Sequence, residues 1–174
     1  MSKHAFQRVL VGWDGSPSAL KGLKWACELT TSGGGTVTAL AVVPSFRHVE
    51  GNEDREHALA DAQEPLQEAF DAAVASLQPR ADHEPSLRFI EDDQVGKALD
   101  QYVAEQMIDL LVVGLHGREG ILHPKIGHIA NHVVKSASCP VLVIPAPPQP
   151  GAIHLEEDAG GLRGLFHIRH HSHA

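Results

Sequence analysis

The segment Ile-Asp-Leu-Leu-Val-Val-Gly-Leu-His-Gly (residues 108–117) decides the fold, because it predicts a buried strand that ends in a glycine-punctuated loop. Its two glycines are followed by Gly127, directly before a helical pattern. Glycines let a backbone bend and approach an anion without interference from Cβ atoms. A helix that begins there points unpaired N–H groups toward the same ligand. The segment therefore predicts a phosphate-binding loop.

The rest of the chain alternates strands with helices. This alternation favours a parallel sheet covered by helices on both faces. Right-handed crossovers leave few topologies, of which we favour strand order 3-2-1-4-5. The predicted fold is a three-layer α/β/α domain with a five-stranded parallel sheet. Strands are predicted at 9–11, 36–43, 87–90, 108–113 and 139–145, and helices at 17–31, 59–77, 95–107 and around 129–134.

In that strand order the chain reverses its direction of winding between the first and fourth strands, and ligands bind at the carboxyl ends there. The first strand ends at Gly12-Trp13-Asp14 and the fourth ends at Gly114. We expect these two ends to share one crevice, with Trp13 shielding it. Asp14 either contacts a ribose or accepts backbone N–H groups within its own turn.

Local signals place the helix boundaries. Ser16 predicts the N-cap of the first helix and Pro17 its first residue, because Ser accepts an orphan N–H and Pro has none to lose. Trp25 on this helix is expected to pack against the core. Residues 44–56 are polar and predicted to be irregular. Pro65 is expected to kink the second helix or to mark its true start.

The composition is that of one soluble globular domain, with 174 residues, 43% hydrophobic and 21% charged. A net charge of −8, with no Lys/Arg cluster along any element, argues against binding to nucleic acid backbones. No apolar run approaches the roughly 18 residues of a membrane span, and no signal peptide is expected. Cys27 and Cys139 are expected to be reduced structural thiols. Together these features favour the cytoplasm.

Two parts of the chain are distinguished. Residues 1–146 hold the whole pattern of strands and helices, and 147–174 contain a Pro-rich linker and a His-rich tail that we expect to be disordered. The tail histidines either bind metal, gain charge at low pH or have no function.

At this point the sequence resembles the universal stress protein family over about residues 6–146. The most specific mark is the spacing of Gly114, Gly117 and Gly127, which fits the family pattern Gly-x2-Gly-x9-Gly. Supporting marks are Val-Leu-Val-Gly-Trp-Asp-Gly-Ser (9–16) and the closing Cys-Pro-Val-Leu-Val-Ile-Pro (139–145).

The resemblance implies a fold of the adenine nucleotide alpha hydrolase-like type, a homodimer paired through the last strand, and a regulatory role in a stress response. It implies ATP or another adenine nucleotide as the ligand and allows Mg²⁺ beside its phosphates. Asp14 would lie near ribose and adenine, and Val42 would line the adenine. The implied nucleotide-binding residues are Trp13, Asp14, Val42, Gly114, His116, Gly117, Gly127, His128 and Ile129.

Three residues depart from the family pattern. His128 replaces the Ser or Thr after the third glycine, Ala130 offers no hydroxyl two residues on, and Leu115 replaces a Ser in the loop. A hydrogen bond to a charged group contributes about 1.5–3 kcal/mol, so lost hydroxyls weaken phosphate binding. Other interpretations stay open: a nucleotide-free dimeric interaction module, a cyclic AMP binder, or an α/β enzyme similar to electron-transfer flavoproteins or sulfurtransferases.

No catalytic set can be assigned. No Lys follows the loop at the P-loop spacing and no acidic pair is positioned for Mg²⁺, so we expect no enzyme, and any ATP hydrolysis should be slow. His128 and His132 share one predicted helix face, and with His116 or His123 they would hold a transition metal. The simpler interpretation is a solvated or phosphate-facing histidine face without metal.

Overall fold

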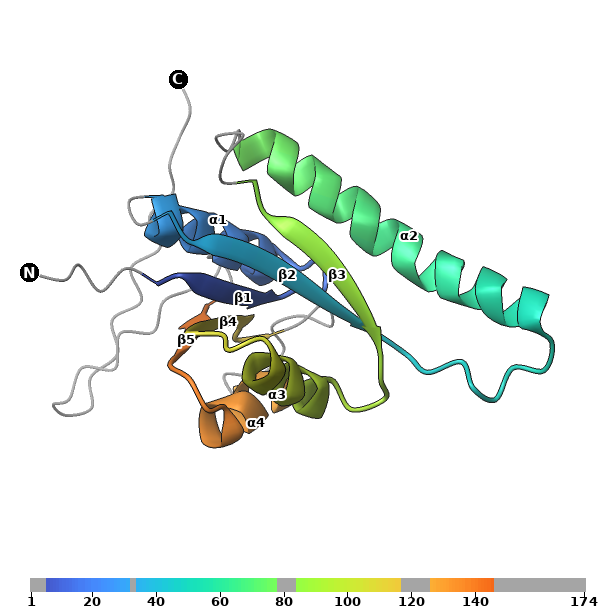
Figure 1. Ribbon diagram of the computed structural model, residues 1–174. Helices are drawn as coiled ribbons and strands as arrows, with labels where there is room; N and C mark the ends of the chain where they lie inside the picture. Colours follow the sequence, from blue (N-terminus) through green and yellow to red (C-terminus); the bar gives the residue numbers. More distant parts are fainter. Residues whose placement is uncertain (1–5, 32–33, 78–83, 117–125, 146–174) are drawn as a thin grey trace, which may run out of the picture.

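The computed structural model describes residues 6–31, 34–77, 84–116 and 126–145, drawn in colour in Figure 1. Its elements follow the predicted alternation of strands and helices. They are β1 (Arg8–Gly12), α1 (Pro17–Thr31), β2 (Thr36–Val43), α2 (Asn52–Leu77), β3 (Ser86–Glu91), α3 (Val95–Glu105), β4 (Leu110–Gly114), α4 (His128–Ser136) and β5 (Val141–Ile144).

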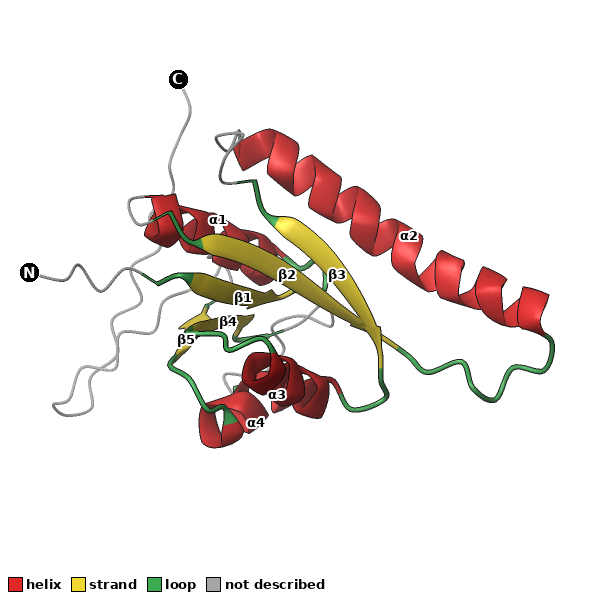
Figure 2. Cartoon of the chain, viewed as in Figure 1, coloured by secondary structure: helices red, strands yellow, loops and turns green. Residues whose placement is uncertain are grey.

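The sheet confirms the predicted fold class. Its five strands run in the order β3-β2-β1-β4-β5, and every neighbouring pair is parallel. Helices α1 and α2 cover one face, and α3 and α4 cover the other, which gives three layers (Figure 2). The chain reverses its winding between β1 and β4, as predicted, so the carboxyl ends of these two strands lie beside each other.

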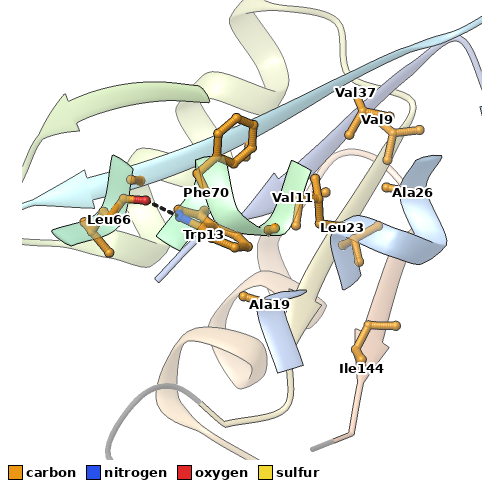
Figure 3. Close-up of a cluster of buried hydrophobic side chains, with 14 of the residues drawn as sticks. Val9, Val11, Trp13, Ala19, Leu23, Ala26, Val37, Leu66, Phe70 and Ile144 are labelled. Carbon is orange, nitrogen blue, oxygen red and sulfur yellow. Dashed lines mark hydrogen bonds between the residues drawn. The ribbon is translucent and has the colours of Figure 1, made fainter. Parts of the chain in front are cut away.

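The core has two halves, one on each face of the sheet, and the alternation of side chains along β1 supplies both. Val9 and Val11 point toward α1 and α2, where they pack with Leu23 and Phe70 (Figure 3). Leu10 points to the other face, toward α3 and α4. All three β1 side chains are at most 1% exposed, so the strand is buried on both faces, as central parallel strands are.

Helix α2 begins earlier than predicted. It starts at Asn52, so the prediction that residues 44–56 are irregular is wrong for its last five positions. Glu53 and Asp54 in the first turn favour a helix start through the helix dipole, a signal that outweighs the missing apolar stripe. The helix also runs through Pro65 as one element, so the prediction that Pro65 marks its true start is wrong (Figure 1).

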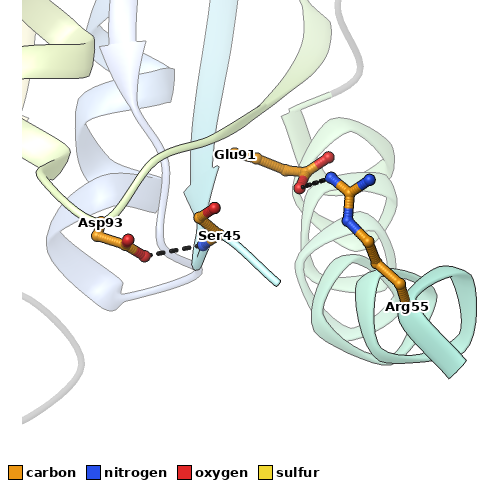
Figure 4. Close-up of polar contacts among 4 residues, drawn as sticks. All are labelled: Ser45, Arg55, Glu91 and Asp93. Atoms are coloured by element: carbon orange, nitrogen blue, oxygen red, sulfur yellow. Dashed lines mark hydrogen bonds and ion pairs between the residues drawn. The ribbon is translucent and has the colours of Figure 1, made fainter. Parts of the chain in front are cut away.

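Two polar contacts join segments at the carboxyl end of the sheet, and one of them holds the beginning of α2. Arg55 on α2 forms an ion pair with Glu91 at the end of β3, with 2.7 Å between Nη2 and Oε2 (Figure 4). The backbone N–H of Ser45, just after β2, donates to Asp93 at 2.9 Å. Both partners of the ion pair are partly exposed, so it contributes at most about 1 kcal/mol and mainly orients the helix.

The two tryptophans behave differently. Trp13 is buried, donates from Nε1 to the carbonyl of Leu66 at 3.0 Å, and packs edge-on against Phe70 (Figure 3). Trp25 is 46% exposed, so its predicted packing is wrong. The buried stripe of α1 is made of small residues and Leu23, and a residue two positions after Leu23 lies on a different side of the helix.

Both cysteines are free and remain protonated at neutral pH. Burial, with a smaller contribution from the charge of Glu28, raises the pKa of Cys27 to about 11. Burial also raises the pKa of Cys139. These environments fit structural thiols. No helix in the described part of the chain is long and apolar enough to cross a membrane.

Helix α3 ends in a left-handed turn at Met107, which has φ of 50° without being glycine. The N–H groups of Met107 and Ile108 donate to the carbonyls of Ala104 (3.4 Å) and Val103 (3.0 Å), respectively. These two hydrogen bonds are the pair that defines a Schellman cap. The Met107 side chain is 69% exposed and contributes little packing to offset the backbone strain.

Met107→Gly should therefore raise the free energy of unfolding by about 1 kcal/mol, because glycine adopts this conformation without steric cost. Urea denaturation measures the change. Met107→Ala is the control, since it removes the same side chain but keeps the Cβ atom. Equal stability of the Gly and Ala variants would contradict the strain argument.

Candidate functional site

A cavity of about 430 Å³ opens at the carboxyl ends of β1, β2 and β4. Its volume falls within the range of small-molecule sites. Residues assigned to the site from sequence come together in it from four separate segments. Those lining it are Trp13, Asp14, Val42, Gly114, His116, Gly127, His128 and Ile129, and the remaining one, Gly117, lies outside the described residues.

The first wall of the cavity is the turn between β1 and α1. Gly15 has a positive φ of 73°, and the Asp14 carboxylate accepts the N–H of Ser16 at 2.9 Å. This is the turn role that was one of the two interpretations of Asp14. The same residue also lines the cavity, so the turn contact holds the carboxylate at the edge of the space that a ligand would occupy.

A chain of hydroxyl groups joins the start of α1 to the loop after β4. Ser16 Oγ accepts the N–H of Ala19 at 3.2 Å, which confirms the predicted cap. Ser18 Oγ donates to the carbonyl of His116 at 2.8 Å, so it accepts from Ser16 Oγ, 3.1 Å away. Ser18 is 2% exposed, and nothing near it in sequence could have indicated this contact.

Two of the spaced glycines are required by close packing inside the protein. A Cβ atom on Gly114 would collide with Ser18 Oγ and lie 3.0 Å from Ser18 Cβ. A Cβ atom on Gly127 would lie 2.8 Å from the carbonyl oxygen of Leu115, which already accepts the Gly127 N–H at 2.9 Å. The glycine spacing therefore shapes the loop around α1 and α4, in addition to any role toward a ligand.

The second wall is the N-terminus of α4. Gly127 is its N-cap, with φ of −59° and ψ of 156°, and has no side chain to cap the first turn. His128 and Ile129 line the cavity and are exposed, whereas Ala130 lines it as a buried residue. His128 therefore lines the cavity with its side chain open to solvent, beside backbone N–H groups that a helix leaves unpaired at its start.

Helix α4 is attached to α3 by His132. Its Nε2 lies 2.9 Å from Oδ2 of Asp100, and a Cβ atom on Gly96 would lie 2.5 Å from its ring carbon Cδ2. The ring therefore contacts α3 at Gly96 and Asp100, one turn after His128. Among the described residues no group of three or more His, Cys, Asp or Glu is positioned to hold a metal ion.

Some lining residues were not predicted. Val95, the first residue of α3, and Leu40 in β2 extend the apolar wall around Val42. Val95 follows β3, whose carboxyl end lies on the same side of the sheet, so strand order alone could have indicated it.

The fold and its cavity define a doubly wound α/β protein with a pocket where such sheets bind their ligands. The sequence profile of the universal stress protein family matches residues 5–145, and the chain belongs to that family. A universal stress protein of Methanocaldococcus jannaschii is 24% identical over 151 residues, which cover 83% of this chain and 85% of the relative. The universal stress protein UspA from Lactobacillus plantarum superposes with a TM-score of 0.67 at 20% identity, over 82% and 99% of the two chains.

Similar structures include nucleotide complexes. A universal stress protein in complex with cAMP has a TM-score of 0.60 at 23% identity, over 82% of this chain and 99% of that one. The protein from Archaeoglobus fulgidus in complex with dAMP has a TM-score of 0.56 at 19% identity, over 80% and 98%. A family member from Arabidopsis thaliana has AMP bound, with a TM-score of 0.54 at 18% identity, over 81% and 92%.

Gly114→Ala should lower the free energy of unfolding by about 1–3 kcal/mol, because the new methyl group displaces Ser18 from the His116 carbonyl. Chemical denaturation of Gly114→Ala, Ser18→Ala and the double variant measures the coupling. When Ser18 is already Ala, Gly114→Ala should lower the free energy of unfolding by about 1 kcal/mol less, because the colliding hydroxyl oxygen is gone. Strictly additive effects would show that the two residues do not compete for this space.

Proposed function

We propose that the cavity binds an adenine nucleotide, and that nucleotide occupancy serves a regulatory role in a cytoplasmic stress response. The observation that carries this proposal is the meeting of an apolar slot and a helix N-terminus in one cavity at the switch point of the sheet. Family members of the same fold with AMP, dAMP or cAMP bound support it.

The apolar part of the cavity suits a purine ring. Leu40, Val42 and Val95 come from β2 and the start of α3, and together offer a hydrocarbon wall. Asp14 stands at the edge of this wall, where its carboxylate can accept hydrogen bonds from ribose hydroxyls. A base would thus bury its faces against aliphatic side chains while the sugar remains near the polar turn.

The polar part suits an anion. The first turn of α4 presents backbone N–H groups and the positive end of the helix dipole beside Gly114 and His116. The expected Ser or Thr donor is absent at His128, and the hydroxyls of Ser16 and Ser18 are already engaged within the protein. This inventory favours a ligand with few phosphates, such as AMP or cyclic AMP, over ATP with Mg²⁺.

The site supports binding better than catalysis. Within the described lining there is no lysine, and Asp14 is the one carboxylate. Phosphoryl transfer relies on cations and metal ligands around the phosphates. Any ATP hydrolysis is therefore expected to be slow.

Calorimetric titration with AMP, cyclic AMP, ADP and ATP tests the binding proposal. The protein should bind AMP or cyclic AMP more tightly than ATP. His128→Ser restores a small hydroxyl donor and should tighten ATP binding by roughly ten- to a hundredfold. Absence of binding by every nucleotide to both forms at millimolar concentration would refute the proposal. Binding by the Ser form alone would instead favour a nucleotide-free interaction module.

We further propose that the protein is a homodimer paired through β5. This strand is the edge of the sheet, and its side chains Val141, Leu142 and Val143 are only half-buried. The carbonyls of Pro140 and Ile144 accept hydrogen bonds from β4, so alternation directs the N–H groups of Val141 and Val143 to the open side. An apolar edge of this kind favours pairing with a second strand.

Val143→Pro should convert the dimer to a monomer, because proline removes an outward N–H while the bonds of β5 to β4 stay in place. Val143→Thr is the matched control, since it keeps both the N–H and the branched shape, and should remain dimeric. Sedimentation equilibrium reports the mass of each form. A monomeric unmodified protein, or a dimeric Pro variant, would contradict pairing through this edge.

A further inference from the structure

We propose that Ser18 is a positioning residue of the nucleotide site: its hydroxyl group holds the start of α4 where the phosphate of a bound nucleotide would lie. The inference rests on the proposed nucleotide function and names a residue on which that function depends. Ser18 is 2% exposed and is not one of the described residues that line the cavity. Any effect of Ser18 on a ligand must therefore pass through the groups that it contacts.

The Ser18 hydroxyl is the middle of a chain of hydrogen bonds in which its proton is already used. It donates that proton to the His116 carbonyl at 2.8 Å, and its oxygen accepts the proton of Ser16 Oγ at 3.1 Å. Ser16 Oγ in turn accepts the N–H of Ala19 at 3.2 Å. Both serines are buried, so a lost hydrogen bond is not simply exchanged for one to bulk water. Removing Ser18 Oγ would thus release the His116 carbonyl from α1 and take away the acceptor of the Ser16 proton.

The backbone that Ser18 holds is also the backbone that holds α4. The Leu115 N–H donates to the carbonyl of Ile144 on β5 at 2.7 Å, and the Leu115 carbonyl accepts the N–H of Gly127 at 2.9 Å. Gly127 is the N-cap of α4, and a Cβ atom there would lie 2.8 Å from the same carbonyl oxygen, so the two segments are in close contact. A continuous path of hydrogen bonds therefore runs from Ser18, through residues 115–116, to the start of α4.

This path matters because the start of α4 is the proposed phosphate site. Gly127 has no side chain to cap the first turn, so its backbone contact with Leu115 orients the beginning of the helix. The N–H groups of that turn bind an anion well only if they are held in place before it arrives. The wall proposed for the base comes from β2 and the start of α3, and neither hydrogen bond of the Ser18 hydroxyl involves these elements. Loss of the hydroxyl should therefore weaken the binding of a phosphate and leave the binding of a base unchanged.

Titration calorimetry with AMP and adenosine at one pH separates the two contributions, because adenosine has the same base and ribose but no phosphate. The variant is Ser18→Ala, which removes only the hydroxyl group. Thr30→Val is the matched control, since Thr30 is on the same helix, is 1% exposed and donates from Oγ1 to the carbonyls of Ala26 (3.0 Å) and Cys27 (3.1 Å). It also loses one buried hydroxyl, but near the opposite end of α1.

Ser18→Ala should bind AMP about three- to tenfold more weakly than the unmodified protein, with the affinity for adenosine unchanged. Thr30→Val should keep both affinities, even where denaturation shows that it is less stable. A second measurement uses the unmodified protein, so it does not depend on the folding of a variant. AMP should slow the hydrogen exchange of the Gly127 N–H, followed by NMR, whereas adenosine should not.

The outcomes that would overturn the inference identify which level fails. If the unmodified protein binds AMP and Ser18→Ala binds it as tightly as Thr30→Val does, nucleotide binding stands and Ser18 has no positioning role. The same conclusion follows if Ser18→Ala weakens AMP and adenosine by equal factors, or if AMP leaves the exchange of the Gly127 N–H unchanged. If the unmodified protein binds neither ligand at millimolar concentration, the proposed function fails together with this inference.

Discussion

The close approach of Ser18 to Gly114 is the constraint on which the site depends. It brings the start of α1 against the end of β4, and the Ser18 hydroxyl then fixes the carbonyl of His116. These two segments are about one hundred residues apart in sequence and become neighbours because β1 and β4 pair at the centre of the sheet. The cavity lies where α1, which follows β1, and α4, which follows β4, cover opposite faces of the sheet.

Sequence reasoning recovered the parts of the fold that are encoded locally. The start of α1 follows from Ser16 and Pro17, and the strand order follows from alternation and crossover handedness. It failed where a tertiary contact or a charge pattern decides the outcome. Helix α2 begins in an acidic segment where apolar residues do not recur at helical spacing. Trp25 is exposed because smaller residues of α1 pack against the sheet.

The candidate site shows the same division. Asp14, Gly114 and Gly127 were predictable, because they stand at strand ends or at a helix start. The partners that shape the cavity were not, since Ser18 and Val95 acquire their roles only through packing between distant segments. One further glycine, Gly96, makes room for the His132 ring on α3, which no spacing rule would have indicated.

The environment of the two cysteines limits how the protein can sense its surroundings. A sulfur atom reacts with peroxides as its anion, and burial holds Cys27 in the neutral form up to a pKa of about 11. Burial also raises the pKa of Cys139. Oxidants should therefore act poorly on these two thiols, so neither cysteine is suited to sense oxidants directly.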